Sequence, residues 1–144
     1  MILDYIILRD GIPIYTRNFD AQQGVTADQA KFTLISGFLS AISTFANTME
    51  HLGQMQEVQM TSEIYFSFKK TSLGETEILF IVASNGDTPK HCVKELITLS
   101  AEQFLCDFEE ELTHRWKGNI TCFERFNDIF DIILQDVNNQ ISAL

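Results

Sequence analysis

The residues best suited to chemistry in this chain are His91 and its neighbour Cys92. A histidine can accept the proton of a cysteine thiol and so activate it as a nucleophile. Adjacent residues of a helix, however, point about 100° apart, so their side chains do not naturally meet. The sequence also lacks the Gly-x-x-x-x-Gly-Lys, Gly-x-Ser-x-Gly and His-Glu-x-x-His motifs of nucleotide, hydrolase and zinc sites. We therefore expect no catalytic residues, and the chain is predicted not to be an enzyme.

Metal and cofactor sites are not indicated either. Each of the three histidines lies near the end of a predicted helix, where a structural role is favoured over metal ligation. The three cysteines, Cys92, Cys106 and Cys122, are odd in number and include no Cys-x-x-Cys pair. This usage favours a reduced, cytoplasmic compartment. We expect no metal ion and no cofactor.

Charge and length limit the class of protein. The 144 residues include 20 Asp and Glu against 10 Lys and Arg, which gives a net charge of −10. No local basic patch is evident, so binding to nucleic acids or to anionic membrane surfaces is not expected. No apolar run reaches the roughly 18 residues of a membrane-spanning helix, and no secretory signal is expected at the N-terminus. The length favours one domain over residues 1–144.

The chain opens with a predicted β-hairpin. Two apolar runs, 1–8 and 12–19, flank the turn residues Asp10 and Gly11. An Asp-Gly pair in this setting is the strongest short-range hairpin signal. The first run is apolar apart from Asp4, and the second contains Pro13.

A long helix is predicted over 27–51, and it begins with the capping box Thr26–Gln29. Its large apolar residues recur at helical spacing and are expected to face the sheet: Ile35, Phe38, Ile42, Phe45, Met49 and Leu52. The opposite arc carries small uncharged residues: Thr33, Ser36, Gly37, Ser40, Ser43, Thr44 and Asn47. This arc is either an exposed Ser/Thr face or a face that a partner subunit covers.

Three strands are predicted after this helix. The runs 56–62 and 63–70 are two strands, or one long strand with a bulge near Ser62. The run 76–84 is the most hydrophobic of the chain, which predicts a central strand with helices on both faces of the sheet.

Two helices complete the predicted order β-β-α-β-β-β-α-α. Thr88 is expected to cap a helix that starts at Pro89 and ends around His114. A second capping box, Thr121–Glu124, is expected to open the last helix, which extends to about Ile141. The sequence therefore predicts an α+β fold.

This order resembles the longin domain of the SNARE-like superfamily over nearly the whole chain. The features that carry the resemblance are the stretch Arg9-Asp-Gly-Ile-Pro13, the stretch Glu63-Ile-Tyr-Phe-Ser-Phe, the strand Ile78-Leu-Phe-Ile-Val-Ala, the pair Pro89-Lys90 and the stretch Phe123-Glu-Arg-Phe. The resemblance implies a five-stranded antiparallel sheet in the order 2-1-5-4-3, with one helix on one face and two on the other.

The resemblance also implies a function in membrane traffic. Longin domains serve as interaction modules and dimeric platforms in the regulation of small Ras-like GTPases. We therefore expect a non-enzymatic, stand-alone module without a SNARE motif, in a homo- or heterodimer with another longin-like chain. A small GTPase is the expected further partner. The expected location is cytoplasmic, peripheral to membranes through partners and without direct membrane insertion. The alternative is a roadblock-like or profilin-like ligand-sensing or scaffold module, although roadblock domains begin with a helix.

In family dimers the first helix and the neighbouring sheet edge commonly form the interface. Transferred to this chain, the resemblance implies these interface residues: Ile14, Tyr15, Thr16 and Arg17 on the edge strand, and Ser36, Gly37, Ser40, Ser43 and Asn47 on the helix.

Overall fold

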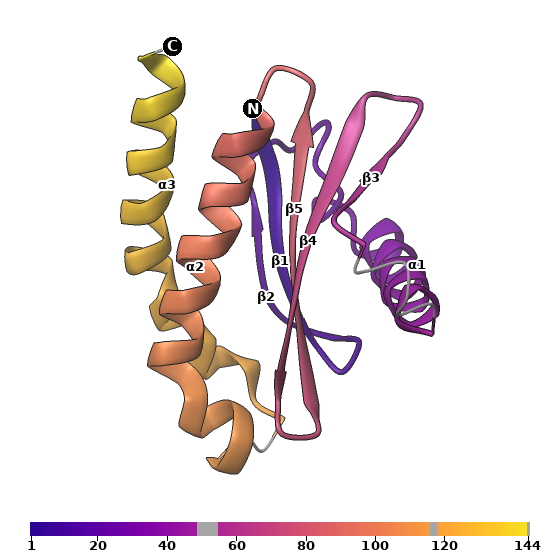
Figure 1. The fold of residues 1–144 in the computed structure, drawn as a ribbon, viewed down its shortest axis with the longest axis vertical. Helices are drawn as coiled ribbons and strands as arrows, with labels where there is room; N and C mark the ends of the chain where they lie inside the picture. The colour runs from indigo at the N-terminus through magenta and orange to yellow at the C-terminus, as the bar shows by residue number, and fades with distance from the viewer. Residues whose placement is uncertain (49–54, 116–117, 144) are drawn as a thin grey trace.

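A single antiparallel sheet organises the computed structural model, which describes residues 1–48, 55–115 and 118–143. Its five strands lie in the order β2-β1-β5-β4-β3. The predicted α+β fold, the sheet order and the order of the elements are confirmed (Figure 1). The main elements are β1 (Ile2–Arg9), β2 (Ile12–Asn18), α1 (Gln29–Asn47), β3 (Glu57–Gln59), β4 (Ile64–Leu73), β5 (Thr76–Asn85), α2 (Lys90–Glu110) and α3 (Phe126–Ser142).

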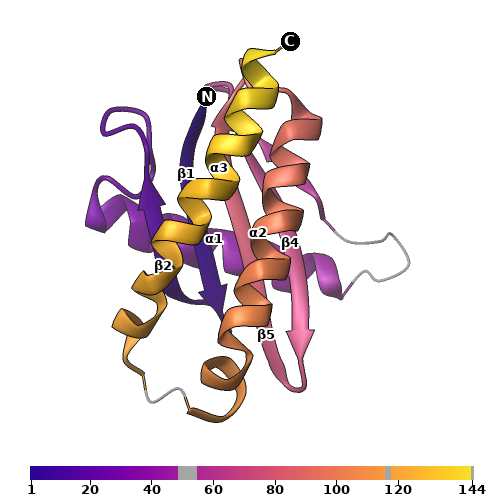
Figure 2. The same ribbon diagram turned by 90° about the vertical axis from the view of Figure 1, so that its left-hand side faces the viewer.

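Helices cover both faces of the sheet, as predicted. α1 lies across one face, and α2 and α3 lie side by side on the other (Figures 1 and 2). The core on the α2–α3 side is rich in phenylalanine: the ring of Phe126 lies 5.1 Å from that of Phe104 and 6.0 Å from that of Phe130. The core on the α1 side is smaller and consists mainly of strand residues: Leu3, Ile6, Leu8, Phe66, Phe68, Leu79, Ile81 and Ala83, with Phe32 and Leu39 from α1.

The opening hairpin forms as predicted. Asp10 and Gly11 have φ values of 48° and 84°, and positive φ at both central residues is typical of the type I′ hairpin turn. β1 lies between β2 and β5 and is buried from Ile2 to Leu8. β2 takes the edge position, where Pro13 is tolerated because only one side of the strand is paired.

The predicted capping box of the first helix is wrong. The Thr26 hydroxyl donates a hydrogen bond to Asp4 of β1 instead of capping the helix. The helix is capped by Asp28, whose Oδ1 accepts the backbone N–H of Ala30 at 2.9 Å and that of Lys31 at 3.4 Å. In a cap the Thr26 oxygen would accept a backbone N–H of the helix, whereas here the hydroxyl donates to the buried Asp4 carboxylate. The predicted continuation of this helix over 49–51 lies outside the described residues.

The two middle strands are separate rather than one strand with a bulge. β3 pairs with β4, and Glu63 stands between them with a φ of 64°. This left-handed conformation reverses the chain direction within a tight turn. β4 continues to Leu73, which is further than predicted.

The starts of the last two helices differ from the predictions. Thr88 caps no helix, because its hydroxyl accepts a hydrogen bond from the N-terminal amine of Met1. Asn119, not Thr121, caps the final segment by accepting the Thr121 N–H at 3.0 Å. This cap opens a 3₁₀ turn over Ile120–Arg125, so α3 begins at Phe126.

Candidate docking surface

The outer edge of the sheet carries the first part of the predicted interface. β2 ends the strand order, and no described strand pairs with its outer side. A groove of about 510 Å³ follows this edge, and all four predicted edge residues, 14–17, line it. Gln29 and Phe32 of α1 and Ile120 of the 3₁₀ turn also line the groove. The unpaired backbone groups of such an edge can receive a further strand.

Two of the predicted edge residues do not present their side chains to a partner. Ile14 and Tyr15 are only 1% and 6% exposed. A bulge in the pairing of β1 and β2 leaves Ile14 without an opposite residue, and a bulge lets successive side chains turn to the same side. Both side chains therefore join the α2–α3 core. Only their backbone groups are therefore left for a partner at this edge, whereas Thr16 is exposed, and the assignment of these residues to an interface stays a prediction.

Tyr15 and Arg17 instead attach β2 to α3. The Tyr15 hydroxyl donates a hydrogen bond to Asn127 Oδ1 at 2.6 Å, and Arg17 Nη2 forms an ion pair with Asp131 Oδ1 at 2.9 Å. The Arg17 guanidinium also lies 5.8 Å from the centre of the Phe130 ring, within the range of a cation–π contact. Arg17 is therefore half-buried and engaged within its own domain.

The electrostatics of this attachment follow from burial. Burial raises the pKa of the Tyr15 phenol, and its contact with Arg17 only partly opposes that shift. Burial lowers the pKa of Arg17, but its hydrogen bonds to Tyr15 and Asp131 outweigh burial, so that the pKa of Arg17 rises overall. The phenol is thus neutral and the guanidinium charged at physiological pH.

Helix α1 carries the second part of the predicted interface, and its rotation differs from the prediction. Ser36 is buried and Ser40 is half-buried, so these residues of the small uncharged arc face the sheet. Gly37 is exposed, as predicted. The side chains of Ser43 and Asn47 lie outside the described part of the structure.

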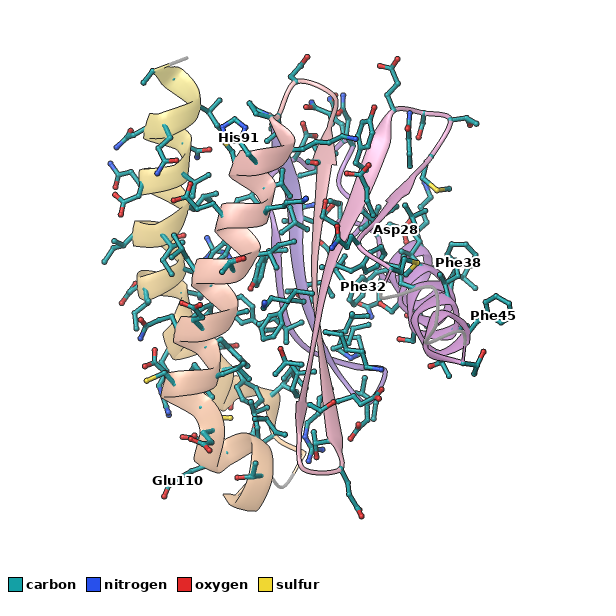
Figure 3. The ribbon with its side chains drawn as sticks, viewed as in Figure 1. Asp28, Phe32, Phe38, Phe45, His91 and Glu110 are labelled. Carbon is teal, nitrogen blue, oxygen red and sulfur yellow. The ribbon has the colours of Figure 1, made fainter. Side chains whose placement is uncertain are left out.

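The outward face of α1 is built from large apolar side chains. Leu34, Phe38 and Phe45 are 75%, 51% and 67% exposed. Phe38 and Phe45 point away from the sheet, whereas Phe32 points toward it (Figure 3). The prediction that Phe38 and Phe45 pack on the sheet is wrong. Together with the exposed Ala41, these residues form what we call the α1 apolar face: Leu34, Phe38, Ala41 and Phe45.

The rotation of α1 has a physical cause in the sheet beneath it. Strand side chains such as Phe66 and Phe68 already fill the layer on this side. Only a narrow stripe of the helix reaches that layer, and Phe32, Ser36 and Leu39 are its buried members. The hydroxyl of Ser36 is buried without a hydrogen-bond partner among the described residues. A small side chain at this position lets the helix rest on bulky strand residues.

The side chains of His91 and Cys92, the pair considered for catalysis, do not come together. His91 is exposed on α2, whereas Cys92 is fully buried in the core (Figure 3). Their side chains therefore lie on different sides of the helix. Among the residues that the structure describes, no group of three or more His, Cys, Asp and Glu could hold a metal ion.

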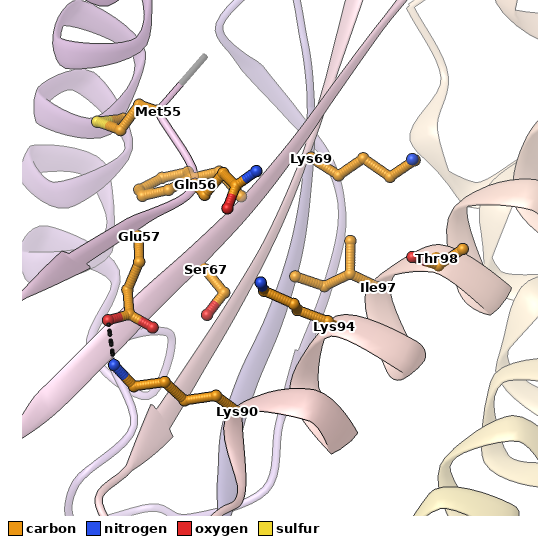
Figure 4. A pocket seen from close by; sticks show the side chains of 10 residues that line it. Met55, Gln56, Glu57, Ser67, Lys69, Lys90, Lys94, Ile97 and Thr98 are labelled. Atoms are coloured by element: carbon orange, nitrogen blue, oxygen red, sulfur yellow. Dashed lines mark hydrogen bonds and ion pairs between the residues drawn. The ribbon is translucent and has the colours of Figure 1, made fainter. Parts of the chain in front are cut away.

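A cluster of lysines forms a second surface, which the sequence analysis missed. Lys69 of β4 and Lys90 and Lys94 of α2 line a groove of about 430 Å³ between α2 and the strands β3 and β4 (Figure 4). We call it the basic groove. Lys90 Nζ pairs there with Glu57 Oε1 at 3.1 Å. The expectation of no local basic patch is therefore wrong. The only signal in the sequence is the four-residue spacing of Lys90 and Lys94, which places them on one side of a helix.

None of the helices in the described part of the chain is both long enough and apolar enough to cross a membrane. A scan of this chain against models of known protein families and a search of curated protein sequences found no match.

Proposed function

We propose that this chain is a non-enzymatic interaction and dimerisation module of the longin type, which works together with a small Ras-like GTPase. The observation that carries the proposal is the α1 apolar face, on which two phenylalanines and a leucine are more than half exposed. Large exposed apolar residues that lie together mark an interaction site. The sheet order is the one that the longin resemblance implies. In this role the protein is cytoplasmic and reaches membranes through its partners.

A second copy of the chain fits the α1 apolar face. After Lys31, α1 carries no charged residue up to its end at Asn47, although the whole chain has a net charge of −10. Two copies can therefore meet at this helix without burying charged groups, which would be costly. Contact elsewhere on so acidic a surface would bring like charges together.

The spacing of the α1 apolar face suits packing against another helix. Steps of four, three and four residues separate Leu34, Phe38, Ala41 and Phe45, which is the pattern of a helix–helix seam. Gly37 stands beside this seam, and a side chain at its position would contact nothing within 4 Å. The second helix can therefore approach the backbone closely there. Burial of each phenylalanine contributes about 1.5–3 kcal/mol to association.

The β2 edge extends this docking surface. Gln29 and Phe32 of α1 line the same groove as Thr16 of β2, so the first turns of α1 adjoin the edge of the sheet. A partner that packs on α1 can thus also reach the unpaired backbone of β2. The edge then adds main-chain hydrogen bonds to the apolar contact.

Light scattering at tens of micromolar protein tests the dimer. We expect the wild type to be dimeric and a Phe38→Ser/Phe45→Ser variant to be a monomer whose circular dichroism spectrum shows that it is still folded. Ile132→Ser is the matched control, because Ile132 is 63% exposed on α3, away from the α1 face. The control should remain dimeric. A monomeric wild type, or a double variant that still dimerises, would contradict the assignment of this face to a second copy.

The GTPase partner needs a separate measurement. Pull-down of purified small Ras-like GTPases, loaded with GDP or with a non-hydrolysable GTP analogue, should show binding to the folded wild type. A Thr16→Lys variant at the β2 edge and the Phe38→Ser/Phe45→Ser variant then locate the contact. The absence of binding in both nucleotide states would remove the GTPase from the proposal and leave the dimer untouched.

A further inference from the structure

We propose that the basic groove binds a small anion that carries two or more phosphate groups. The groove lies between α2 and the strands β3 and β4 (Figure 4), and no residue of the α1 apolar face lines it. The inference is therefore independent of the proposed dimer.

The floor of the basic groove is a polar strip of sheet beside α2. Side chains alternate along β4, so Phe66 and Phe68 join the core on the α1 side, while Tyr65, Ser67 and Lys69 belong to the other face. α2 covers the centre of the sheet with its apolar residues and runs alongside this strip. The strip and the helix together form an elongated, open channel.

The protein balances only one of the three positive charges in the basic groove, that of Lys90, which pairs with Glu57. The side-chain amines of Lys69 and Lys94 form no hydrogen bond or ion pair with any other described residue, and Glu57 is the only acidic residue of the lining. Lys90 and Lys94 stand four residues apart on α2, where like charges destabilise the helix. The first turn of α2 contains no acidic residue, so its N-terminal dipole adds further positive potential. A bound anion would relieve this repulsion.

One neutral donor, the Ser67 hydroxyl, adds to the site. The Ser67 hydroxyl belongs to a side chain that is only 8% exposed, and it has no hydrogen bond to another described residue. Lys90 and Lys94 extend from α2 toward the strands, with their amines on the side of Glu57 and Ser67 (Figure 4). Ammonium groups from separate elements act as adaptable point charges, and such groups suit the tetrahedral phosphate better than a planar carboxylate.

The size of the groove points to more than one phosphate group. The basic groove of about 430 Å³ shares Glu57, Ser67 and Lys90 with an adjoining hollow of about 230 Å³. That hollow reaches Tyr65, whose ring lies 5.6 Å from Lys90 Nζ. The combined space has room for a diphosphate or a larger relative.

Glu57 modulates the site. Its carboxylate holds the Lys90 amine at 3.1 Å and therefore competes with an incoming anion. Glu57→Gln should release Lys90 and remove one repulsive charge, so that the affinity for the anion rises several-fold. If the anion were attracted only nonspecifically to the protein surface, Glu57→Gln would change its affinity far less, since one charge in so acidic a chain matters little at a distance.

Calorimetric titration with inorganic pyrophosphate at near-physiological salt tests the proposal. We expect saturable binding by the wild type and a loss of at least about tenfold in Lys69→Gln/Lys94→Gln, because charged hydrogen bonds are lost. Lys70→Gln is the matched control. Lys70 neighbours Lys69 in sequence but is paired with Glu77 at 2.8 Å and lies outside the basic groove, so binding should persist. Thermal unfolding of each variant establishes that it is folded.

Three results would overturn the proposal. The first is the absence of saturable pyrophosphate binding by the folded wild type. The second is equal weakening in Lys70→Gln and in the groove variant, which indicates general charge attraction. The third is binding only to vesicles that contain a bisphosphorylated lipid, without binding of free pyrophosphate. The Phe38→Ser/Phe45→Ser variant should still bind pyrophosphate, so failure of the dimer and failure of the anion site are distinguishable.

Discussion

The hydroxyl of Thr26 donates a hydrogen bond of 2.6 Å to the carboxylate of Asp4, which is fully buried in a central strand. The same carboxylate accepts the backbone N–H of Val25 at 2.7 Å and the side-chain amide of Asn18 at 2.9 Å. A buried charge is tolerated only when it is so fully hydrogen-bonded. Asp4 therefore attaches the connector between β2 and α1 to the centre of the sheet.

Asp4→Ala should destabilise the protein strongly. The substitution leaves four part-buried donors of Asn18, Val25 and Thr26 without their acceptor, and we expect a loss of about 3 kcal/mol in the free energy of unfolding. Urea unfolding followed by circular dichroism measures the loss. Asp136→Asn is the control, because Asp136 is exposed on α3 and its substitution should change little. If the two variants were equally stable, the bonds to Asp4 would not hold the connector.

The rotation of α1 predicts that truncating two phenylalanines of the same helix changes the free energy of unfolding by very different amounts. Phe32 is 7% exposed and Phe38 is 51% exposed. Phe32→Ala should cost about 3 kcal/mol of stability through lost packing, whereas Phe38→Ala should stay within about 0.5 kcal/mol. Both values are measured by urea unfolding at protein concentrations low enough to keep the chain monomeric. A larger loss of stability in Phe38→Ala than in Phe32→Ala would contradict this orientation of α1 and favour the one that the sequence pattern predicts.

Arg17 should contribute more through packing than through its ion pair. Asp131, its partner at 2.9 Å, has a side chain that is 55% exposed, and such pairs contribute about 0.2–1 kcal/mol. The guanidinium also lies over the rings of Phe19 and Phe130. Arg17→Ala should therefore destabilise the protein more than Asp131→Asn, by about 1 kcal/mol at low salt. Thermal unfolding with and without added salt separates the two contributions, and equal losses would contradict this division.

Stability should fall at alkaline pH because of Tyr5. Burial raises its pKa well above the ordinary value, although the hydrogen bond to Ser100 partly opposes the shift. Below about pH 10 the tyrosine is protonated in both the folded and unfolded chains, so stability is unaffected. At higher pH the unfolded chain releases the proton while the folded protein retains it, and stability declines. The urea midpoint as a function of pH should decline less steeply in Tyr5→Phe, and parallel profiles would exclude this origin.

The hairpin and the central strands were predictable because their signals are local. An Asp-Gly turn determines the pairing of β1 with β2, and a continuous apolar run such as 76–84 requires cover on both faces. The sheet order also followed from the resemblance. The helix caps were harder to predict, because Thr26 forms its hydrogen bond with Asp4, a residue more than twenty positions away.

The candidate surfaces could be predicted only in part. Hydrophobic spacing marks the most apolar arc of α1, but it does not say whether that arc meets its own sheet or a partner. The bulge at Ile14 likewise breaks the simple alternation from which edge residues are assigned. The basic groove joins lysines of β4 and α2, and such a cluster exists only once the chain has folded.

The pairing of β1 with β5 has a consequence for how the protein forms. These neighbours at the centre of the sheet join Ile2 to Ser84 and Arg9 to Ile78, whereas β1–β2 and β4–β5 are hairpins with short turns. The hairpins close quickly, but their docking must close a long loop and is therefore expected to limit the folding rate. During synthesis the apolar β1 strand cannot complete its pairing until β5 has left the ribosome. Until then the nascent chain exposes β1, which later lies at the centre of the sheet, to chaperones and to other chains.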